Sequence, residues 1–299
     1  MSLADHVRTL GRGPGRSRSL TRAEAADAMR LMLSGDAAPE AVGALLMLLR
    51  MKGETADEIA GFAAAAQAAM PPVGPVDLDW PCYAAGRTRG APLFLHSARA
   101  VARAGHRVLI HGWNGGDDAV RAGLVQAGIA MADSPDRAAH LLDLDGIAYL
   151  PLEAAHPALF GLLRLRSVLG LRSCVNTVCR MLNPGRAPAS VQGVFHPSYR
   201  LLQADAAQRL DWDRLTVIKG GGGEFERNPA KMVAAFGLRD GAAWQVDLPP
   251  VWNCAAEPRP GSDLPAHLSP FETAMVAETT ALALDTLGTA ATAAHAQPA

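Results

Sequence analysis

The sequence predicts an α/β protein with a small helical N-terminal domain and a larger α/β domain built on a mainly parallel sheet. Several helix-capping motifs occur in the first 70 residues of the chain and predict helices there. After them, short β-branched or apolar runs alternate with alanine- and leucine-rich stretches of helical length, which is typical of a parallel sheet covered by helices. The chain has 299 residues, 49% of them hydrophobic, and can therefore bury a substantial core.

The first two helices of the N-terminal domain, which we place at residues 1–70, have clear boundaries. Thr21 and Glu24 form a capping box, and the helix that they open should end at Gly35. A second helix should begin at Pro39, because proline suits the first helical position. Its apolar residues form one stripe at helical spacing: Val42, Leu45, Leu46 and Leu49.

A third helix and a hinge lead into the larger domain. Thr55 and Glu58 form another capping box, and the two prolines at 71–72 must end this helix. The segment PPVGPVD predicts a hinge before the larger domain, which we place at 75–299. Its strand-like runs are RVLIHG, AYLPL, VQGVF, LTVIKG and WQVDL. Ligands usually bind at the carboxyl ends of parallel strands, which places HGWNGGDD and KGGGGEFE at candidate site positions.

Composition argues against several classes of protein. The N-terminus is polar and arginine-rich and lacks the apolar segment of a secretory signal, and no apolar run is long enough to span a bilayer. The four cysteines form no CxxC pair, so reduced thiols in a cytoplasmic protein are the simplest interpretation. The net charge is −1 and the pI is about 6.8, so any affinity for nucleic acid must come from where the charges lie.

Arginines are segregated from acidic residues in two windows of the sequence. No aspartate or glutamate occurs between Asp79 and Asp117, or between Glu153 and Asp205, although both windows contain several arginines. Because the planar guanidinium pairs bidentately with phosphate or carboxylate, this distribution predicts a site for an anionic ligand. The alternative is a set of surface arginines, some lying over apolar faces.

Two segments resemble the anthranilate phosphoribosyltransferase family, a glycosyltransferase family 3 group related to the pyrimidine nucleoside phosphorylases. The first contains LLRMKGETADEIAGF and the second contains LRLRSVLGLRSCVN. In and around the second, the residues at matching positions are His156, Arg166, Arg172, Asn176, Asn183 and Pro184. In the enzymes, the arginine matching Arg166 contacts the aromatic carboxylate substrate. We expect His156 itself to be structural, as a turn residue ahead of a proline.

The resemblance extends to about residue 250 and implies a fold and an assembly. The fold is that of the nucleoside phosphorylases and phosphoribosyltransferases, in which a segment near 160–185 joins the helical domain. The assembly is a homodimer packed through the helical domains. The stripe at 42–49 could contribute to that contact, although packing within its own domain explains it more simply.

The resemblance breaks at the loops that hold pyrophosphate in the enzymes. Their first loop reads Gly-Thr-Gly-Gly-Asp, whereas this chain has YAAGRTRGAP, with Arg87 and Arg89 in place of the acidic residue and close-set glycines. Their second loop reads Lys-His-Gly-Asn-Arg. Here it is IHGWNGGDD, which keeps His111 and Gly112 but has Trp113 where the asparagine belongs.

The third loop of the enzymes ends in an Asp-Glu pair that holds magnesium through its oxygen atoms. An ungapped register of KGGGGEFERNP places Phe225 and Glu226 on that pair, and a shift by two places Gly223 and Glu224 there. Neither register restores the pair. Magnesium is therefore expected only if the protein is an enzyme, with Glu224 and Glu226 as candidate ligands. Without several stabilisers of the leaving group, anthranilate phosphoribosyltransferase activity is not expected.

These departures resemble the non-biosynthetic YbiB-like branch, which keeps the architecture and is associated with nucleic-acid binding. Its loop pattern HGxxGExxxNP matches KGGGGEFERNP without a gap, including Asn228 and Pro229. We therefore expect a protein that binds nucleic acid or another phosphate-bearing ligand in an arginine-rich groove. The residues expected at that site are Arg87, Arg89, His111, Asn114, Arg164, Arg166, Arg172 and Lys219, with Trp113 available to stack on a base.

Other interpretations remain open. One is a phosphoribosyl or pentosyl transferase with a different acceptor, in which His111 and Arg166 position the substrate and Glu224 or Glu226 holds a metal ion. Another is a catalytically silent dimer with a scaffolding role. The structural alternatives are a hydrogen-bonded strand end for His111, a partly buried loop aromatic for Trp113 and solvated loop residues for the two glutamates. A groove open at both ends would favour a polymer, and a closed pocket would favour a small ligand.

Overall fold

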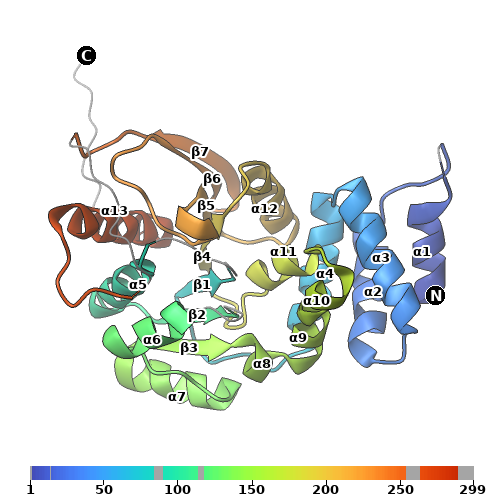
Figure 1. The fold of residues 1–299 in the computed structure, drawn as a ribbon, viewed down its shortest axis with the longest axis horizontal. Coiled ribbons are helices and arrows are strands. Elements are labelled where there is room, and N and C mark those ends of the chain that lie inside the picture. Colours follow the sequence, from blue (N-terminus) through green and yellow to red (C-terminus); the bar gives the residue numbers. More distant parts are fainter. Residues whose placement is uncertain (1, 14, 84–89, 114–117, 254–262, 289–299) are drawn as a thin grey trace.

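The structure is a computed structural model, and it describes residues 2–13, 15–83, 90–113, 118–253 and 263–288. It confirms the predicted architecture of a helical N-terminal domain beside a larger α/β domain (Figure 1). The blue helices at one end of Figure 1 are the N-terminal domain, and the sheet with its covering helices fills the rest of the molecule. Within these ranges no helix has the length and apolar character needed to cross a membrane.

The N-terminal domain contains the predicted helices and one more. Its helices are α1 (Leu3–Gly11), α2 (Arg22–Ser34), α3 (Pro39–Lys52) and α4 (Ala56–Ala68). The capping boxes at Thr21 and Thr55 are confirmed, and α2 ends at Gly35 with a left-handed φ of 80°. The additional helix, α1, has a capping box of its own between Ser2 and Asp5.

The apolar stripe on α3 lies in the core of its own chain. Leu45, Leu46 and Leu49 expose no surface, and Val42 exposes 7%. Packing within the domain, the simpler of the two explanations, is therefore confirmed for this stripe. A contact between two copies of the chain would have to use other side chains.

Four short helices from the middle of the chain lie beside the N-terminal domain. They are α8 (Leu152–Ala155), α9 (Pro157–Arg164), α10 (Arg166–Leu169) and α11 (Val175–Arg180). Helix α9 packs on α2, and α11 packs on α4. His156 links α9 to α4, because its Nε2 donates to Ala66 O on α4 at 3.1 Å and its Nδ1 accepts from Leu159 N on α9 at 3.4 Å. Its predicted structural role is confirmed.

The described part of the larger domain forms one seven-stranded sheet of order β3-β2-β1-β4-β5-β6-β7. The strands are β1 (Leu78–Cys82), β2 (Val108–Gly112), β3 (Ile147–Pro151), β4 (Ala189–Val194), β5 (Arg214–Lys219), β6 (Val233–Arg239) and β7 (Ala242–Leu248). Strands β1 to β5 are parallel, and β6 and β7 run antiparallel at one edge. The mainly parallel sheet is confirmed, so the carboxyl ends of the central strands meet at one edge.

Helices cover both faces of this sheet. They are α5 (Phe94–Arg103), α6 (Asp118–Gln126), α7 (Pro135–Asp145), α12 (Ser198–Arg209) and α13 (Pro270–Leu287). Alternate residues of β2 face opposite ways. Ile110 packs in the cluster that contains α5 and α13, whereas Leu109 packs in the cluster that contains α7 and the N-terminal domain. The N-terminal domain thus extends the core on one face of the sheet.

The linker that was expected to be a hinge is packed into this arrangement. Val73 is fully buried, and its backbone N–H donates to Pro184 O at 3.1 Å. Val76 is buried as well, and a Cβ at Gly185 would lie 2.3 Å from its side chain. The linker is therefore fixed against the segment that follows α11.

Glu58 joins two segments of the N-terminal domain from a fully buried position. Its carboxylate accepts from Leu20 N and Thr55 N, each at 2.8 Å, and Lys52 Nζ lies 3.3 Å away. We predict that Glu58→Ala lowers the free energy of unfolding by roughly 2–4 kcal/mol, because two backbone donors lose their acceptor. Urea denaturation measures this loss of unfolding free energy. The control Glu40→Ala, at an exposed position, should lower the free energy of unfolding by less than about 1 kcal/mol. Equal losses in the two variants would contradict the prediction.

A second carboxylate should make the stability of this domain depend on pH. Hydrogen bonds from Arg18, at 2.6 and 2.7 Å, are the main reason that the pKa of Glu24 falls from 4.5 to about 2. Because the folded pKa lies below the unfolded one, the stabilisation is present above 4.5 and is lost as pH falls toward 2. We predict that Glu24→Gln is less stable than the parent protein near neutral pH. Denaturation over this acid window should show the difference shrinking, and a constant difference would contradict the assignment.

Candidate functional site

The glycine run after β5 forms a tight turn that folds back onto the strand ends. The turn η1 (Gly221–Gly223) has φ of 65° at Gly222 and 91° at Gly223, in the left-handed region that favours glycine. At Gly220 a Cβ would lie 1.6 Å from Glu224 O, so only glycine fits there. Three of the four glycines are thus required by the turn itself.

The residues after this turn are buried. Phe225 exposes no surface and meets Trp80 edge-on, with ring centroids 5.5 Å apart. Glu224 exposes 1% and accepts from Cys82 Sγ at 3.4 Å. Glu226 exposes 3% and accepts from Phe94 N, at the start of α5, at 3.0 Å. The expectation of solvated loop glutamates is wrong, because the tight turn directs both side chains inward.

Magnesium is usually held by one or two carboxylates together with water and phosphate oxygens, and the carboxylates of Glu224 and Glu226 do not share a partner in these hydrogen bonds. The two glutamates contact different partners, a thiol and a helix N-terminus. Across the residues that the structure describes, no group of three or more His, Cys, Asp or Glu side chains could hold a metal ion.

His111 lies inside the sheet, with 1% of its side chain exposed. Its Nδ1 is 3.0 Å from the Tyr83 hydroxyl, and its Nε2 is 3.0 Å from Asp79 Oδ1. Burial is the main reason that the pKa of Tyr83 is raised well above its ordinary value, so the hydroxyl keeps its proton. Ser190 donates to the other oxygen of Asp79 at 2.8 Å. The geometry is that of the hydrogen-bonded strand-end alternative.

Trp113 is half-buried directly after β2. Its ring meets Phe160 edge-on, with centroids 5.7 Å apart, and the guanidinium of Arg164 lies 5.8 Å from the centre of the same Phe160 ring. These contacts match the alternative of a partly buried loop aromatic. Arg164 itself is exposed.

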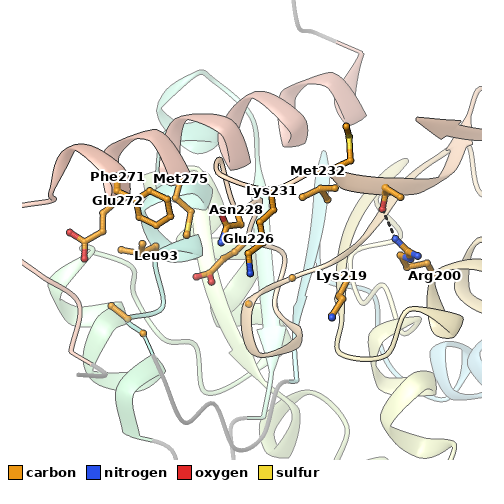
Figure 2. Close-up of a pocket in the computed structure, with 16 residues that line it drawn as sticks. Leu93, Arg200, Lys219, Glu226, Asn228, Lys231, Met232, Phe271, Glu272 and Met275 are labelled. Carbon is orange, nitrogen blue, oxygen red and sulfur yellow. Dashed lines mark hydrogen bonds between the residues drawn. The ribbon is translucent and has the colours of Figure 1, made fainter. Parts of the chain in front are cut away.

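A first cavity, of about 370 Å³, lies between the glycine turn, α13 and the start of β6 (Figure 2). Lys219 and Lys231 line it from exposed positions and Arg200 from a half-buried one, and the buried Glu226 and Glu272 also line it. Much of the remaining wall is apolar, with Leu93, Met232, Phe271 and Met275 labelled in Figure 2. Three basic and two acidic side chains therefore line this cavity, so its charge is mixed.

A second cavity, of about 320 Å³, lies where the N-terminal domain meets the carboxyl end of β4. We call it the four-arginine cavity. Its arginines come from α3, α10, the following loop and α11: Arg50, Arg166, Arg172 and Arg180. No aspartate or glutamate is found among the described residues that line it. Its polar and aromatic lining includes Asn176, Phe195, His196, Tyr199 and Gln203.

The guanidiniums of this cavity are close enough to affect one another. Burial, and then the positive charges of Arg166 and Arg180, lower the pKa of Arg172 from its ordinary value. Arg180 is held in place, because its Nε donates to Gly193 O at 3.1 Å and its Nη1 donates to Asn176 O at 3.2 Å. An anion in the cavity would relieve this repulsion.

The structure thus brings some of the expected residues together and separates others. Arg166 and Arg172 share the four-arginine cavity, whereas Lys219 and Glu226 line the other cavity. The residues expected at 87, 89 and 114 lie outside the part of the chain that is described: Arg87, Arg89 and Asn114. Arg180 belongs to the second acid-free window, from which an anion site was predicted, although it was not among the residues expected at that site. Arg50 was not anticipated, because it reaches the cavity only through the fold.

Comparisons with known proteins identify the family of this chain. Residues 4–70 match the helical bundle domain of a glycosyl transferase family, and residues 93–249 match its a/b domain. An anthranilate phosphoribosyltransferase from Solibacter usitatus is 32% identical over 279 residues, covering 90% of this chain and 81% of that protein. One from Geobacillus stearothermophilus is 30% identical over 240 residues, covering 78% and 70%.

Solved structures show the same fold. An anthranilate phosphoribosyltransferase from Thermus thermophilus superposes with a TM-score of 0.77 at 23% identity, covering 95% of this chain and 89% of that one. The Saccharomyces cerevisiae enzyme in complex with PRPP and Mg gives 0.65 at 17% identity, covering 82% and 71%. With both domain models matched in order, the chain belongs to the glycosyl transferase family that includes the anthranilate phosphoribosyltransferases.

Proposed function

We propose that this protein binds a phosphate-bearing ligand, a nucleic acid or a smaller phosphorylated molecule, in the four-arginine cavity. The observation that carries the proposal is that four arginines line one cavity with no carboxylate among its described lining residues. Guanidiniums suit this task because their planar donors pair bidentately with phosphate oxygens. Two of them, Arg172 and Arg180, are partly or largely buried, so their attraction for an anion is screened less than at an open surface.

We also propose that the protein does not make the tryptophan precursor formed by its relatives. In the ungapped register, the position of the enzymes' metal-binding aspartate is Phe225, which packs against Trp80. A helix N-terminus can bind an anion, but that of α5 already receives the carboxylate of Glu226. Loss of a single electrostatic stabiliser typically costs roughly a hundred- to a thousandfold in rate, and this loop differs at more than one position.

The alternative is a transferase that uses a different acceptor. It is favoured by the relatives, which are anthranilate phosphoribosyltransferases at 30% and 32% identity, and by the place of Arg166 in the cavity. Release of pyrophosphate from phosphoribosyl pyrophosphate, measured with a panel of acceptors, separates the two functions. Turnover above the uncatalysed rate would favour the transferase.

A homodimer through the helical domain, which the family resemblance implies, is part of the same proposal. Because the stripe on α3 is buried within the chain, the contact would involve other residues of that domain. One candidate is Met51, which is 82% exposed at the end of α3.

Fluorescence anisotropy of a labelled single-stranded oligonucleotide tests the binding function. For the parent protein, the logarithm of the affinity should fall linearly with the logarithm of salt concentration. Arg172→Ala should weaken binding roughly tenfold and reduce the salt slope by about one, because one guanidinium–phosphate contact is lost. The control Arg137→Ala, at an exposed position of α7, should leave the affinity and the salt slope nearly unchanged. No binding by the parent protein at low salt would rule out nucleic acid and leave small phosphorylated ligands, tested by thermal shift.

A second test asks whether the buried loop can accept a metal ligand. We predict that Phe225→Asp lowers the free energy of unfolding by more than about 3 kcal/mol, because it removes the contact with Trp80 and buries a carboxylate. Phe225→Leu, which keeps an apolar side chain, should cost about half as much. Millimolar magnesium should change the Tm of the parent protein by less than about 1 °C. A clear rise in Tm with magnesium would contradict this prediction.

A further inference from the structure

The mouth of the four-arginine cavity carries exposed apolar side chains. Phe195 follows β4 and lines the cavity with 58% of its surface exposed. The neighbouring ring of His196 meets it edge-on, with centroids 4.9 Å apart and planes at 82°. Leu171, which is 49% exposed, lines the same cavity. A single exposed apolar residue is ordinary, but two at the opening of a cationic cavity suit a ligand with a flat apolar group beside its charge.

The wall of this cavity also contains a polar atom without a partner. Gln203 lines the cavity from α12, is 1% exposed, and its Oε1 makes no hydrogen bond in the described part of the chain. An unsatisfied buried acceptor typically costs about 1–3 kcal/mol, so a ligand that brings an N–H or O–H donor would be favoured there. The base of a nucleotide carries such N–H donors at a distance from its phosphate, so one ligand can reach both Gln203 and the arginines.

We propose that the ligand is a nucleotide, free or within a single strand, whose base stacks on Phe195 while its phosphate lies among the guanidiniums. This inference rests on the proposed binding function and specifies its ligand. Three mutually repelling arginines favour phosphate over a single carboxylate, because phosphate presents more acceptor oxygens. The volume of about 320 Å³ lies at the lower end of the range for small-ligand pockets.

The stacking side chain in this proposal is Phe195 and not Trp113. The ring of Trp113 is half-buried against Phe160, so a base would have to displace an existing contact. Phe195 is exposed and already lies beside the arginines. Outside the cavity, the exposed Arg164 lies two residues before Arg166 and offers a second phosphate contact to a strand. Stacking on an aromatic side chain is tolerant of sequence, because every base has a π-face.

The test compares a thymidine oligonucleotide of about 12 residues with an abasic strand of the same length, again by anisotropy. The parent protein should prefer the thymidine strand by about tenfold. Phe195→Ala should reduce that preference to near one without changing the affinity for the abasic strand. Phe195→Trp should restore it. Because Phe195 is exposed, these variants should fold like the parent protein, which thermal melting checks.

The outcomes separate this inference from the function on which it rests. If the parent protein binds neither strand nor thymidine monophosphate, this inference is overturned, and the binding function is then decided by the thermal-shift test with other small phosphorylated ligands. If it binds both strands equally and Phe195→Ala changes nothing, the arginine site stands and base stacking is overturned. Displacement by thymidine monophosphate that weakens in Phe195→Ala supports a nucleotide and identifies the free monomer as sufficient. Displacement by benzoate but not by thymidine monophosphate overturns the inference in favour of an aromatic carboxylate.

Discussion

The close contact between Asp79 and His111 in the middle of the sheet is the constraint on which the rest of the site depends. It joins β1 to β2, and the hydrogen bond from Ser190 to the same carboxylate extends it to β4. A buried carboxylate is costly unless it is hydrogen-bonded, and Ser190 supplies that bond, so Asp79 contacts both strands that neighbour β1. Gln192, further along β4, donates to Arg180 O at 3.0 Å. The polar centre of the sheet is thereby connected to the wall of the four-arginine cavity.

The two cavities at this edge of the sheet have different electrostatic character because they border different elements. The cavity beside the glycine turn has a mixed lining: Glu272 comes from α13, Glu226 from the loop after the turn, and Lys219, Lys231 and Arg200 add positive charge. The four-arginine cavity takes arginines from α3, α10 and α11 and from the loop after α10, and no carboxylate is among its described lining residues. The cavity against the helical domain is therefore the one lined by positive charge alone.

The parts of the fold that the sequence predicts are those set by local interactions. Two capping boxes, at Thr21 and Thr55, are found where expected, and α2 ends as expected at Gly35 in the left-handed conformation. These features depend only on neighbours within four residues. The short strand β1 was not among the predicted runs, because a proline and an aspartate interrupt its apolar pattern. The burial of Glu226 also could not be read from sequence, since its partner, Phe94 N, lies 132 residues away. The family resemblance predicted the order of the domains. That Arg50 and Arg172 line the same cavity could be seen only in the structure.

The burial of Phe225 has a consequence for how this loop can change over evolutionary time. Its ring fills space beside Trp80, and the turn that delivers it depends on glycines at 220, 222 and 223. A polar residue at 225 would leave a hole in the core unless a neighbouring side chain grew at the same time. A change to an acidic residue there would therefore need accompanying substitutions around Trp80. The packing restricts which side chains position 225 can carry, independently of what the loop binds.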